Sequence, residues 1–392
     1  MLERSDSALT RRGDTFAGSH AVAEELHEAL AGASVPKEYQ EAFLTVSSSS
    51  SESGLLMATD LREAPDAVRR QSKTLARPLT KLVALLRNSP PRVVVTCARG
   101  SSANAATFGK YLIERHLGIP VADAAPSIMS VYRRGLMLEG QLFLAISQSG
   151  RSEDLIESAS RAKSSGAITV ALVNDTNSPL AAACDIILPM EAGAERSIAA
   201  TKTFVSSAAA LVSLVATWTN DLEMMAAVDR LPDRLASAAE LDWAQAQSAF
   251  SAAQCLVTLG RGPTFAIAQE AALKLKEVCN IHAEAFSGAE FQHGPITLVS
   301  SGYPVLIFMP TDAAASNLAG LEADLRRKRA AVLTTANGGG VRGQLPVLAP
   351  DHPDTDAVCL IQSLYALAIR LALHRGIDVD QPRHLRKITR TR

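Results

Sequence analysis

The feature that most constrains this fold is an alternation of short apolar runs with longer amphipathic stretches. The runs are rich in Val, Ile and Leu and too short for typical helices, which favours buried strands. In the first half of the chain they occupy residues 93–96, 142–146, 168–173 and 186–188. Amphipathic stretches such as residues 103–116 and 152–165 lie between them. Strands that alternate with helices in this way predict a parallel sheet.

A second copy of the pattern follows, with apolar runs at residues 255–259, 305–308, 331–333 and 345–348. Val-Thr-Cys-Ala-Arg-Gly ends at Gly100, and the similar Val-Thr-Leu-Gly-Arg-Gly ends at Gly262. The interval from Gly100 to Asn174 also nearly equals the interval from Gly262 to Asn337. These matches indicate an internal duplication. We therefore expect an α/β fold of two tandem, doubly wound parallel-sheet domains, each a three-layer α/β/α arrangement.

The same pattern predicts the domain boundaries. Residues 1–56 contain a run of serines and are expected to be a disordered or poorly packed extension, with Met57 as a candidate start of the ordered chain. A helical segment should follow at residues 57–90 and the first domain at 91–220. A helical linker is expected at residues 221–250, the second domain at 251–375 and a C-terminal tail at 376–392.

Composition narrows the classes of function. The net charge is −1, so bulk electrostatics suggest neither a nucleic-acid nor a membrane partner. The five cysteines include no Cys-x-x-Cys pair, which argues against a disulfide framework or a zinc site. No run approaches the roughly 18 apolar residues of a membrane helix, and no signal-peptide pattern opens the chain. We expect a cytoplasmic protein. The basic stretch at residues 383–392 suits either a small anionic substrate or plain solvation.

Two small, hydroxyl-rich loops follow neighbouring strands of the first domain, at residues 99–104 and 147–152. Ligands of doubly wound sheets bind beyond the carboxyl ends of the strands. Helix N-termini with serine hydroxyls suit a phosphate dianion, so the pair of loops predicts phosphate binding. The alternative is that Ser101, Ser102 and Ser152 only cap helices. The second domain lacks such loops, because residues 262–264 and 310–313 replace them.

The second domain instead carries a dense polar segment at residues 270–277. Glu270, Lys274 and Glu277 share one helical face, which by itself is more typical of a solvated, salt-bridged surface. Further ionisable residues follow at residues 282–286 and 290–295, beside a Gly-Pro turn. This density favours a functional loop, with His293 as a candidate functional residue.

These segments resemble a known family. Residues 147–150, 199–202, 270–277, 282–285 and 292–295, with the tail at 378–387, are similar to the isomerase half of glutamine-fructose-6-phosphate aminotransferase. The similarity covers about residues 57–392, in order and with closely similar spacing. It implies two sugar isomerase (SIS) domains. The aminotransferase has an N-terminal glutaminase whose Cys nucleophile follows the initiator Met, whereas residue 2 here is Leu and the first cysteine is Cys97. We expect no glutaminase, and the resemblance extends to stand-alone glucosamine-6-phosphate deaminases.

The resemblance also implies roles for single residues. Glu277 matches the base that moves a proton between C1 and C2, and His293 matches the ring-opening residue. Lys387 matches a tail lysine that contacts the open sugar, and Lys274 joins the catalytic group beside Glu277. The family's substrate- and phosphate-binding positions correspond to Gly100, Ser101, Ser102, Ser147, Gln148, Ser149, Ser152, Ile198 and Ala200. Ala200 replaces a sugar-contacting serine and Ser101 replaces a threonine, so hexose contacts are expected to differ.

The chemistry is coherent without the family. Moving a proton from C2 to C1 needs one carboxylate within reach of both carbons, and opening a hemiacetal suits a histidine. We expect neither a metal nor another cofactor, a phosphosugar as substrate, and a homodimer in which His293 reaches the neighbouring subunit's site. Three alternatives remain open at this point. They are another phosphosugar isomerase or a fructosamine-6-phosphate deglycase, an ammonia-dependent synthase, and a non-catalytic phosphosugar sensor.

Overall fold

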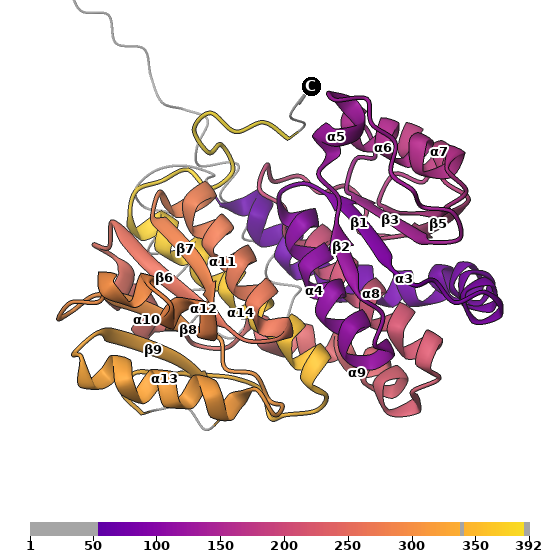
Figure 1. The fold of residues 1–392 in the computed structure, drawn as a ribbon. Coiled ribbons are helices and arrows are strands. Elements are labelled where there is room, and N and C mark those ends of the chain that lie inside the picture. The colour runs from indigo at the N-terminus through magenta and orange to yellow at the C-terminus, as the bar shows by residue number, and fades with distance from the viewer. Residues whose placement is uncertain (1–53, 338–340, 388–392) are drawn as a thin grey trace, which may run out of the picture. The chain divides into compact units, whose positions relative to one another are not determined.

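The computed structural model describes residues 54–337 and 341–387, which lie in one compact unit. Its first half contains a five-stranded parallel sheet of order β2-β1-β3-β4-β5 (Figure 1). The strands are β1 Val94–Ala98, β2 Val121–Asp123, β3 Leu142–Ser147, β4 Ile168–Val173 and β5 Ile186–Pro189. The central strands are buried along nearly their whole length, because helices cover both faces of the sheet.

Alternate residues of these strands enter two different hydrophobic cores, as a buried parallel sheet requires. Val94 packs with helices on one face, and Val95 packs with helices on the other. The helices of the first face are α3 Leu55–Asn88, α4 Ser101–Leu117 and α8 Lys202–Thr219. The other face is covered by α5 Pro126–Ser130, α6 Glu153–Ser164 and α7 Pro179–Ala183. The first half is therefore a three-layer α/β/α unit.

The second half repeats this arrangement with a parallel sheet of order β10-β9-β8-β6-β7. Its strands are β6 Cys255–Gly260, β7 His282–Ser287, β8 Pro304–Ile307, β9 Ala331–Ala336 and β10 Gln344–Pro346. Its helices are α11 Pro263–Cys279, α12 Gly288–Gln292, the 3-10 turn η1 Pro295–Leu298, α13 Ala315–Arg327 and α14 Pro353–His374. Helices α9 Leu222–Ala239 and α10 Ala244–Phe250 connect the halves.

One constant shift in residue number relates the two halves, and we call it the repeat shift. It takes Ser101, where α4 begins, to Pro263, where α11 begins, and each helix has 17 residues. The register agrees as well, because Val94 of β1 pairs with Val121 just as Leu256 of β6 pairs with Ala283. The glycines before the two helices share one unusual backbone conformation, with φ 54° and ψ −133° in the first half and φ 60° and ψ −139° in the second. The predicted duplication and fold class are confirmed.

The two halves share one hydrophobic core. This core includes side chains of α3, α4 and α8 from the first half and of α11 and α14 from the second. Helices α4 and α11 lie side by side at its centre (Figure 1). Among the described helices, only α14 is long and apolar enough to cross a membrane, and 78% of its apolar window is buried inside the fold. Its hydrophobicity is therefore that of a core helix.

Three segments differ from the sequence-based expectation. Helix α3 begins at Leu55, so Gly54 to Leu56 belong to the ordered fold, and the rest of the predicted extension lies outside the described residues. Strand β2 escaped the sequence analysis because it has only three residues, of which two are exposed. Residues 282–287, expected to be a functional loop, form the edge strand β7 paired with β6. Charged side chains are tolerated there because an edge strand is partly exposed.

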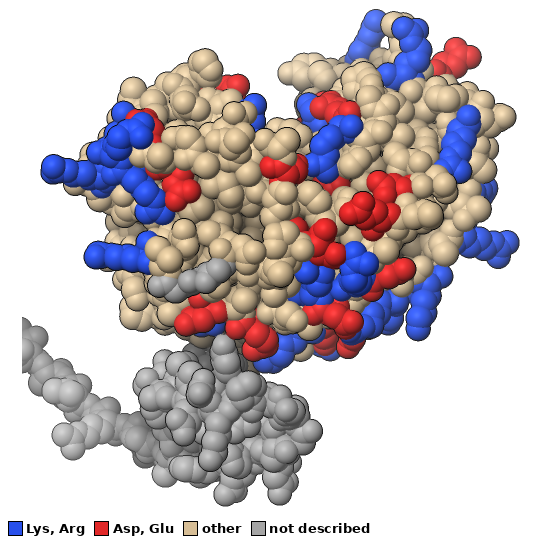
Figure 2. All heavy atoms as spheres, turned by 90° about the horizontal axis from the view of Figure 1, so that it is seen from below, with Lys and Arg blue, Asp and Glu red and all other residues tan. Residues whose placement is uncertain are grey.

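Charge on the surface is mixed. On the described part of the face that Figure 2 shows, lysine and arginine side chains are interspersed with aspartate and glutamate side chains. Several form surface ion pairs, such as Arg230 with Asp351 at 2.7 Å. Neither sign dominates this face, in keeping with a net charge of −1.

Candidate active site

The two hydroxyl-rich loops of the first half meet at one edge of its sheet. Strands β1 and β3 are hydrogen-bonded neighbours, with Ala98 paired to Ile146, and both run in the same direction. The segments that follow them therefore leave the sheet together. The first holds Gly100, Ser101 and Ser102 at the start of α4, and the second runs from Ser147 to Ser152 at the start of α6.

The second loop is a tight turn that its sequence specifies. Ser147 Oγ accepts a hydrogen bond from the Gly150 amide at 3.1 Å, and Ser149 Oγ accepts one from the Arg151 amide at 3.3 Å. Gly150 has φ 61°, and a Cβ there would lie 2.1 Å from Ser178 Oγ, so only glycine fits. Within the described chain neither serine donates a hydrogen bond, so both O–H groups remain able to donate to an anion.

The helix-cap alternative finds no support in these serines. Ser152 occupies the N-cap position of α6, but its side chain makes no capping hydrogen bond. Ser101 and Ser102 are the first residues of α4, after the N-cap Gly100, so neither is the cap. The hydroxyls of Ser102 and Ser152 are partly exposed and available for a ligand. Ser101 is committed differently, because its hydroxyl donates to the carboxylate of Glu270 at 3.0 Å.

Glu270 connects the two halves of the molecule. It lies on α11 and is fully buried, yet its carboxylate accepts hydrogen bonds from Ser101 and from Asn104 of α4 at 3.0 and 2.8 Å. The buried hydroxyl of Tyr365 on α14 adds a third hydrogen bond at 3.1 Å. Burial raises the pKa of Glu270, although Lys274 and Asn104 lower it. The start of the first-half loop is thereby fixed to the helix that carries the predicted base.

Lys274 and Glu277 complete this network. The Lys274 ammonium is fully buried, lies 3.6 Å from Glu270 Oε1 and donates a hydrogen bond to Glu277. Burial lowers the pKa of Lys274, but Glu270, Glu277 and, to a smaller extent, Glu195 more than offset it, so the pKa is raised. The Glu277 side chain is 18% exposed and stands at the open end of the network. The predicted helical face is therefore a buried charge network and not a solvated surface.

The tail lysine binds the loop that precedes α8. Lys387 Nζ donates to Glu195 Oε2 at 2.9 Å and to the carbonyl oxygen of Ser197 at 2.6 Å. Ile198 and Ala200, predicted to contact the sugar, lie in the same loop and are partly exposed. Because Glu195 contributes to the raised pKa of Lys274, this loop is within electrostatic range of the α11 network. The structure thus gathers residues from the loop, the tail and α11.

A second buried ion network holds that loop in place. Asp60 of α3 accepts hydrogen bonds from the Arg196 and Ser197 amides, the latter at 2.8 Å. The fully buried Lys202 lies 3.0 Å from Asp60 and 2.6 Å from Glu63. Helix α3 therefore positions the loop through charged groups. Hydrogen bonds from the loop amides to a carboxylate fix the direction of the backbone, which non-directional apolar contacts do not.

His293 is the predicted residue that this chain does not bring to the others. It follows α12 in the second half, is exposed, and its side chain makes no hydrogen bond or ion pair among the described residues. Its backbone amide donates to the Glu290 carbonyl oxygen at 3.0 Å, which fixes the turn but not the ring. An exposed, unengaged imidazole is free to act outside its own half of the chain.

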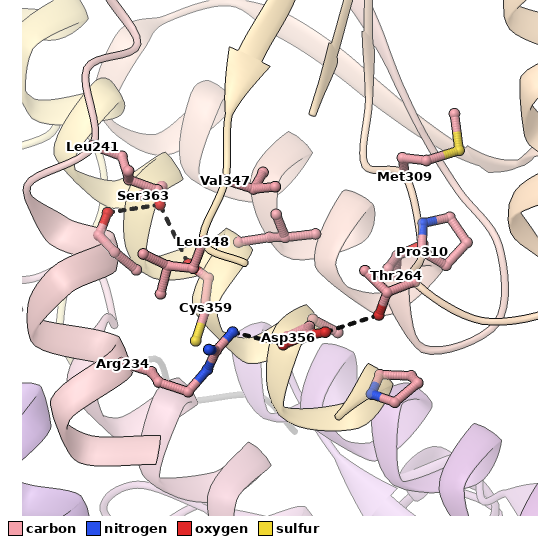
Figure 3. Close-up of a pocket in the computed structure, with 15 residues that line it drawn as sticks. Arg234, Leu241, Thr264, Met309, Pro310, Val347, Leu348, Asp356, Cys359 and Ser363 are labelled. Atoms are coloured by element: carbon pink, nitrogen blue, oxygen red, sulfur yellow. Dashed lines mark hydrogen bonds and ion pairs between the residues drawn. The ribbon is translucent and has the colours of Figure 1, made fainter. Parts of the chain in front are cut away.

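Figure 3 shows a small pocket beside α14 in the second half. Its volume is about 30 Å³, enough for a single water molecule. Asp356 accepts hydrogen bonds from Arg234 at 2.7 Å and from Thr311 at 2.9 Å, so its polar groups pair with one another. Thr311 corresponds to Ser149 under the repeat shift. Thr311 is therefore tied to the fold through Asp356, and this small pocket has no room for a sugar.

Three residues of the site escaped the sequence analysis in these roles. Asn104 is one polar residue of the loop at 99–104, Tyr365 is a lone aromatic residue within an apolar helix, and Glu195 is an isolated acid. Only the packed structure shows that all three bind the network. Among the described residues no group of three or more His, Cys, Asp or Glu side chains is placed to hold a metal.

Comparisons with known proteins agree with the fold of two related halves. The family described as "SIS domain" matches residues 85–217 and 250–341. The glutamine–fructose-6-phosphate aminotransferase of Gluconobacter oxydans is 34% identical over 84% of this chain and 58% of its own length. That of Symbiobacterium thermophilum is 33% identical over 76% of this chain and 51% of its own length. The chain spans about half the length of the curated relatives it matches.

Solved structures extend the similarity to whole chains. A presumed phosphosugar isomerase from Silicibacter pomeroyi superposes with a TM-score of 0.79 at 42% identity, over 83% of this chain and 99% of that one. The C-terminal domain of the Francisella tularensis aminotransferase gives 0.74 at 26% identity, over 83% and 98%. A glucosamine-6-phosphate deaminase from Thermotoga maritima shares the fold, with a TM-score of 0.63 at 22% identity over 84% and 100%.

Proposed function

This chain belongs to the SIS domain family, and from that premise we propose that it is a phosphosugar isomerase acting on an amino sugar. In its finer form, the proposal is that the protein is a glucosamine-6-phosphate deaminase. It would convert glucosamine 6-phosphate to fructose 6-phosphate and ammonia. Relatives and solved structures whose names include a sugar phosphate or a phosphosugar support a phosphosugar as the substrate.

The observation that carries the proposal is the bond between the α11 network and the first loop. Glu270 accepts a hydrogen bond from Ser101 and lies 3.6 Å from Lys274, which in turn holds Glu277. A carboxylate for proton transfer is thereby fixed relative to the loops proposed to hold phosphate. Lys274 donates a hydrogen bond to Glu277 and so holds the carboxylate that the proposal assigns as general base.

The duplication supports the proposal that Glu277 of the second half reaches toward the serine loop of the first half. Under the repeat shift Glu277 corresponds to Arg115 of α4. Arg115 reaches out of its own half and binds Asp312, which follows β8, at 2.7 Å. The first-half equivalent of Asp312 is Gly150, in the serine loop. By the same geometry, Glu277 would reach toward the serine loop of the first half.

The proposed reaction needs only acid–base chemistry. Glu277 removes the proton from C2 of the open-chain amino sugar, which gives an enolamine, and returns a proton to C1. The product is a ketimine at C2, to which water adds. The C2–N bond of the resulting carbinolamine then breaks, which releases ammonia and leaves the C2 carbonyl of fructose 6-phosphate.

Other groups prepare the substrate for that step. Ser147, Ser149 and Ser152 hold the phosphate in the proposal, and their hydroxyls are available for it. Lys387 reaches the open chain from the tail. His293 supplies proton transfer for ring opening, and because its own chain gives it no partner among the described residues, we propose that it acts in the neighbouring subunit.

The reverse reaction is a second candidate, and the identity to the curated aminotransferases favours it. In that case the same residues would form glucosamine 6-phosphate from fructose 6-phosphate and ammonia. Both directions pass through the same proton transfer at Glu277. Ammonia release from glucosamine 6-phosphate, measured beside glucosamine 6-phosphate formation from fructose 6-phosphate and ammonium, distinguishes the two directions.

The variant Glu277→Gln tests the proposal. We expect at least a thousandfold loss of ammonia release from glucosamine 6-phosphate, within the roughly 10²–10⁴-fold range of general acid–base groups. Wash-in of deuterium from heavy water at C2 should be lost with it. The variant should fold, because Lys274 keeps Glu270 as a partner at 3.6 Å. Glu284→Gln, which changes an exposed carboxylate of β7, is the matched control.

Normal exchange at C2 in Glu277→Gln would remove the residue from the mechanism. Absence of ammonia release by the unmodified protein, together with formation of glucosamine 6-phosphate, would support the reverse direction. Absence of both activities would leave the chain without the proposed function.

A further inference from the structure

A cavity between the last turns of α4 and the second half has no part in the proposed reaction. Its volume is about 830 Å³, and it opens beside the N-terminus of α11 and the last turn of α4. A phosphosugar fits a space of this size. Its polar lining consists of Tyr111, Arg115, His116, Arg261, Ser287, Glu290, Asp312 and His352.

The duplication identifies what this cavity corresponds to. The repeat shift takes Gly100 to Gly262 and takes residues 147–152 to residues 309–314. Gly262 and residues 312–314 line the cavity. Gly262 also keeps the unusual backbone of Gly100, and a Cβ on it would meet no atom within 4 Å, so the cavity is open at this point. The cavity is therefore the second-half counterpart of the candidate phosphate site.

One substitution between the halves changes the charge of this counterpart. In the first half the guanidinium of Arg99 is paired with Asp154 at 2.7 Å. Under the repeat shift, Arg99 becomes Arg261 and Asp154 becomes Ser316. Among the described residues Arg261 has no carboxylate partner, and its hydrogen bond is to Ser287 Oγ at 3.3 Å. The second half thus presents a half-buried cation, without a carboxylate partner, where the first half has a neutralised one.

The N-terminus of α11 is poorly suited to bind an anion by itself. Pro263 removes one backbone N–H from the first turn of α11. The Thr264 hydroxyl donates to the Arg261 carbonyl oxygen at 3.0 Å and is thereby occupied. An anion here would bind to the Arg261 side chain, with the Ser287 hydroxyl as a second donor, because arginine matches phosphate geometry in a bidentate way.

The rest of the lining limits the ligand further. Arg115 is neutralised by Asp312 and Asp354, so it adds little net positive charge. Glu290 is exposed, and its carboxylate has no partner among the described residues. The cavity therefore offers a cation at one point and carboxylate acceptors at another. That pattern suits a molecule with one phosphate and several hydroxyl groups, and not an inorganic anion alone.

We propose that this cavity is a second, non-catalytic binding site for a phosphorylated sugar or sugar alcohol. Arg261 and Ser287 bind the phosphate, and Glu290 with Asp312 accept hydrogen bonds from the hydroxyl groups. Glu277 and the serine loop belong to the first site, so no proton transfer is assigned to the second.

Titration calorimetry of the full chain with glucitol 6-phosphate tests the proposal. This open-chain sugar alcohol has no carbonyl or amine, so it cannot react at C1 and C2. We expect two molecules bound per chain. Arg261→Ala should weaken one of the two by roughly 10- to 100-fold, the range for a lost hydrogen bond to a charged group. Arg261→Lys should lose less, because it keeps the charge.

Two further variants serve as a control outside the cavity and as a test of the first site. Arg342→Ala removes an exposed arginine of the second half outside the cavity and should leave both affinities unchanged. Ser149→Ala should weaken the other molecule and leave the Arg261-dependent one intact. A thermal melt of each variant confirms that it is folded.

One molecule per chain, weakened by Ser149→Ala and unaffected by Arg261→Ala, would overturn the second site. Binding that depends on Arg261 alone, with no effect of Ser149→Ala, would support this site and contradict the proposed function of the first. The two proposals can therefore fail separately.

Discussion

The side chains of the candidate site differ in whether the fold already engages them. Ser101 donates to Glu270, and Lys274 lies between two carboxylates, so both are held by protein partners. The hydroxyl protons of Ser147 and Ser149 have no acceptor within the described chain. Groups of the first kind fix geometry, and groups of the second kind are free for a ligand. Substitutions at the two kinds should therefore have different effects.

Ser149→Ala tests a free hydroxyl. We expect KM for glucosamine 6-phosphate to rise about tenfold and kcat to change less, because a phosphate contact acts in the ground state and the transition state alike. Steady-state kinetics measure both constants. Ser160→Ala, at an exposed serine of α6 that bonds only within its own helix, should leave KM unchanged. An unaltered KM in Ser149→Ala would remove this residue from the phosphate site.

Asp354 tests an engaged charge. It is fully buried at the start of α14, bonds to Arg115, and lies 2.9 Å from His116 Nε2. Burial raises the pKa of Asp354, but His116 and Arg115 more than offset this, and the pKa is lowered. A carboxyl with a lowered pKa stabilises the fold above its unfolded-state pKa of about 4, and this stabilisation is lost as the pH falls through the folded-state pKa.

Asp354→Asn should therefore lower the free energy of unfolding by about 3 kcal/mol at pH 7, in the range for breaking a buried ion pair. The difference from the unmodified protein should shrink as the pH falls from about 4 through the lowered pKa of Asp354 in the folded protein. Urea denaturation over a series of pH values measures it. Asp324→Asn, at a surface pair of α13, should cost less than about 1 kcal/mol. A difference that grows toward low pH would contradict the argument.

Among the elements, α3 is held at its start by the other end of the chain. Asp380 accepts hydrogen bonds from the amides of Gly54, Leu56 and Met57, at 2.9, 3.1 and 3.0 Å. A carboxylate at this position satisfies free N–H groups and opposes the positive end of the helix dipole. Because α3 also positions the loop before α8 through Asp60, its N-terminus matters for the site.

Two truncated chains test this capping. Removal of residues 1–53 should leave the contact with Asp380 complete. Removal of residues 1–56 also deletes two of its three donors, the amides of Gly54 and Leu56. We expect the shorter chain to be less stable by about 2 kcal/mol and to melt several degrees lower. Calorimetry measures the difference. Equal melting temperatures would restore the sequence-based boundary at residue 57.

For the whole molecule, the duplication puts the two halves on one core, while the His293 ring has no hydrogen-bond or ion-pair partner among the described residues. Helices α4 and α11 pack against each other. Ser101 at the start of α4 belongs to the candidate phosphate loops of the first half, whereas Arg115 near the end of α4 contacts Asp312 of the second half. Such crossing accounts for the base coming from the second half and the phosphate loops from the first. The His293 side chain makes no hydrogen bond or ion pair with them among the described residues, which is why it is proposed to act in the site of a second subunit.

Mixing two inactive variants, Glu277→Gln and His293→Ala, tests the shared site. If His293 acts in the neighbouring subunit, each mixed dimer has one site with both defects and one site with none. Ammonia release should then recover to about a quarter of the unmodified activity in an equal, fully exchanged mixture, since half of the dimers are mixed and each has one intact site. If His293 acts in its own subunit, the mixture stays inactive. Native mass spectrometry confirms that mixed dimers formed.

The sequence alone determined the periodic features. Apolar runs alternating with amphipathic stretches predicted parallel sheets, the repeated Arg-Gly signature predicted the duplication, and the two serine loops were identified from the residues directly after β1 and β3. These inferences succeed because strands, helices and turns are decided largely by residues close together in the chain. Their weak points were short or exposed elements such as β2 and β7, whose periodicity is poor.

Only the tertiary structure decided which distant groups pair. Ser101 and Glu270 are 169 residues apart, and Lys387 and Glu195 are 192 apart, so no local pattern links them. The same holds for Arg99 and Arg261, which have matching local sequence, while the distant residue Asp154 neutralises only the first. A side chain's charge state and availability depend on what packs around it in space. That environment exists only once both halves have folded onto their common core.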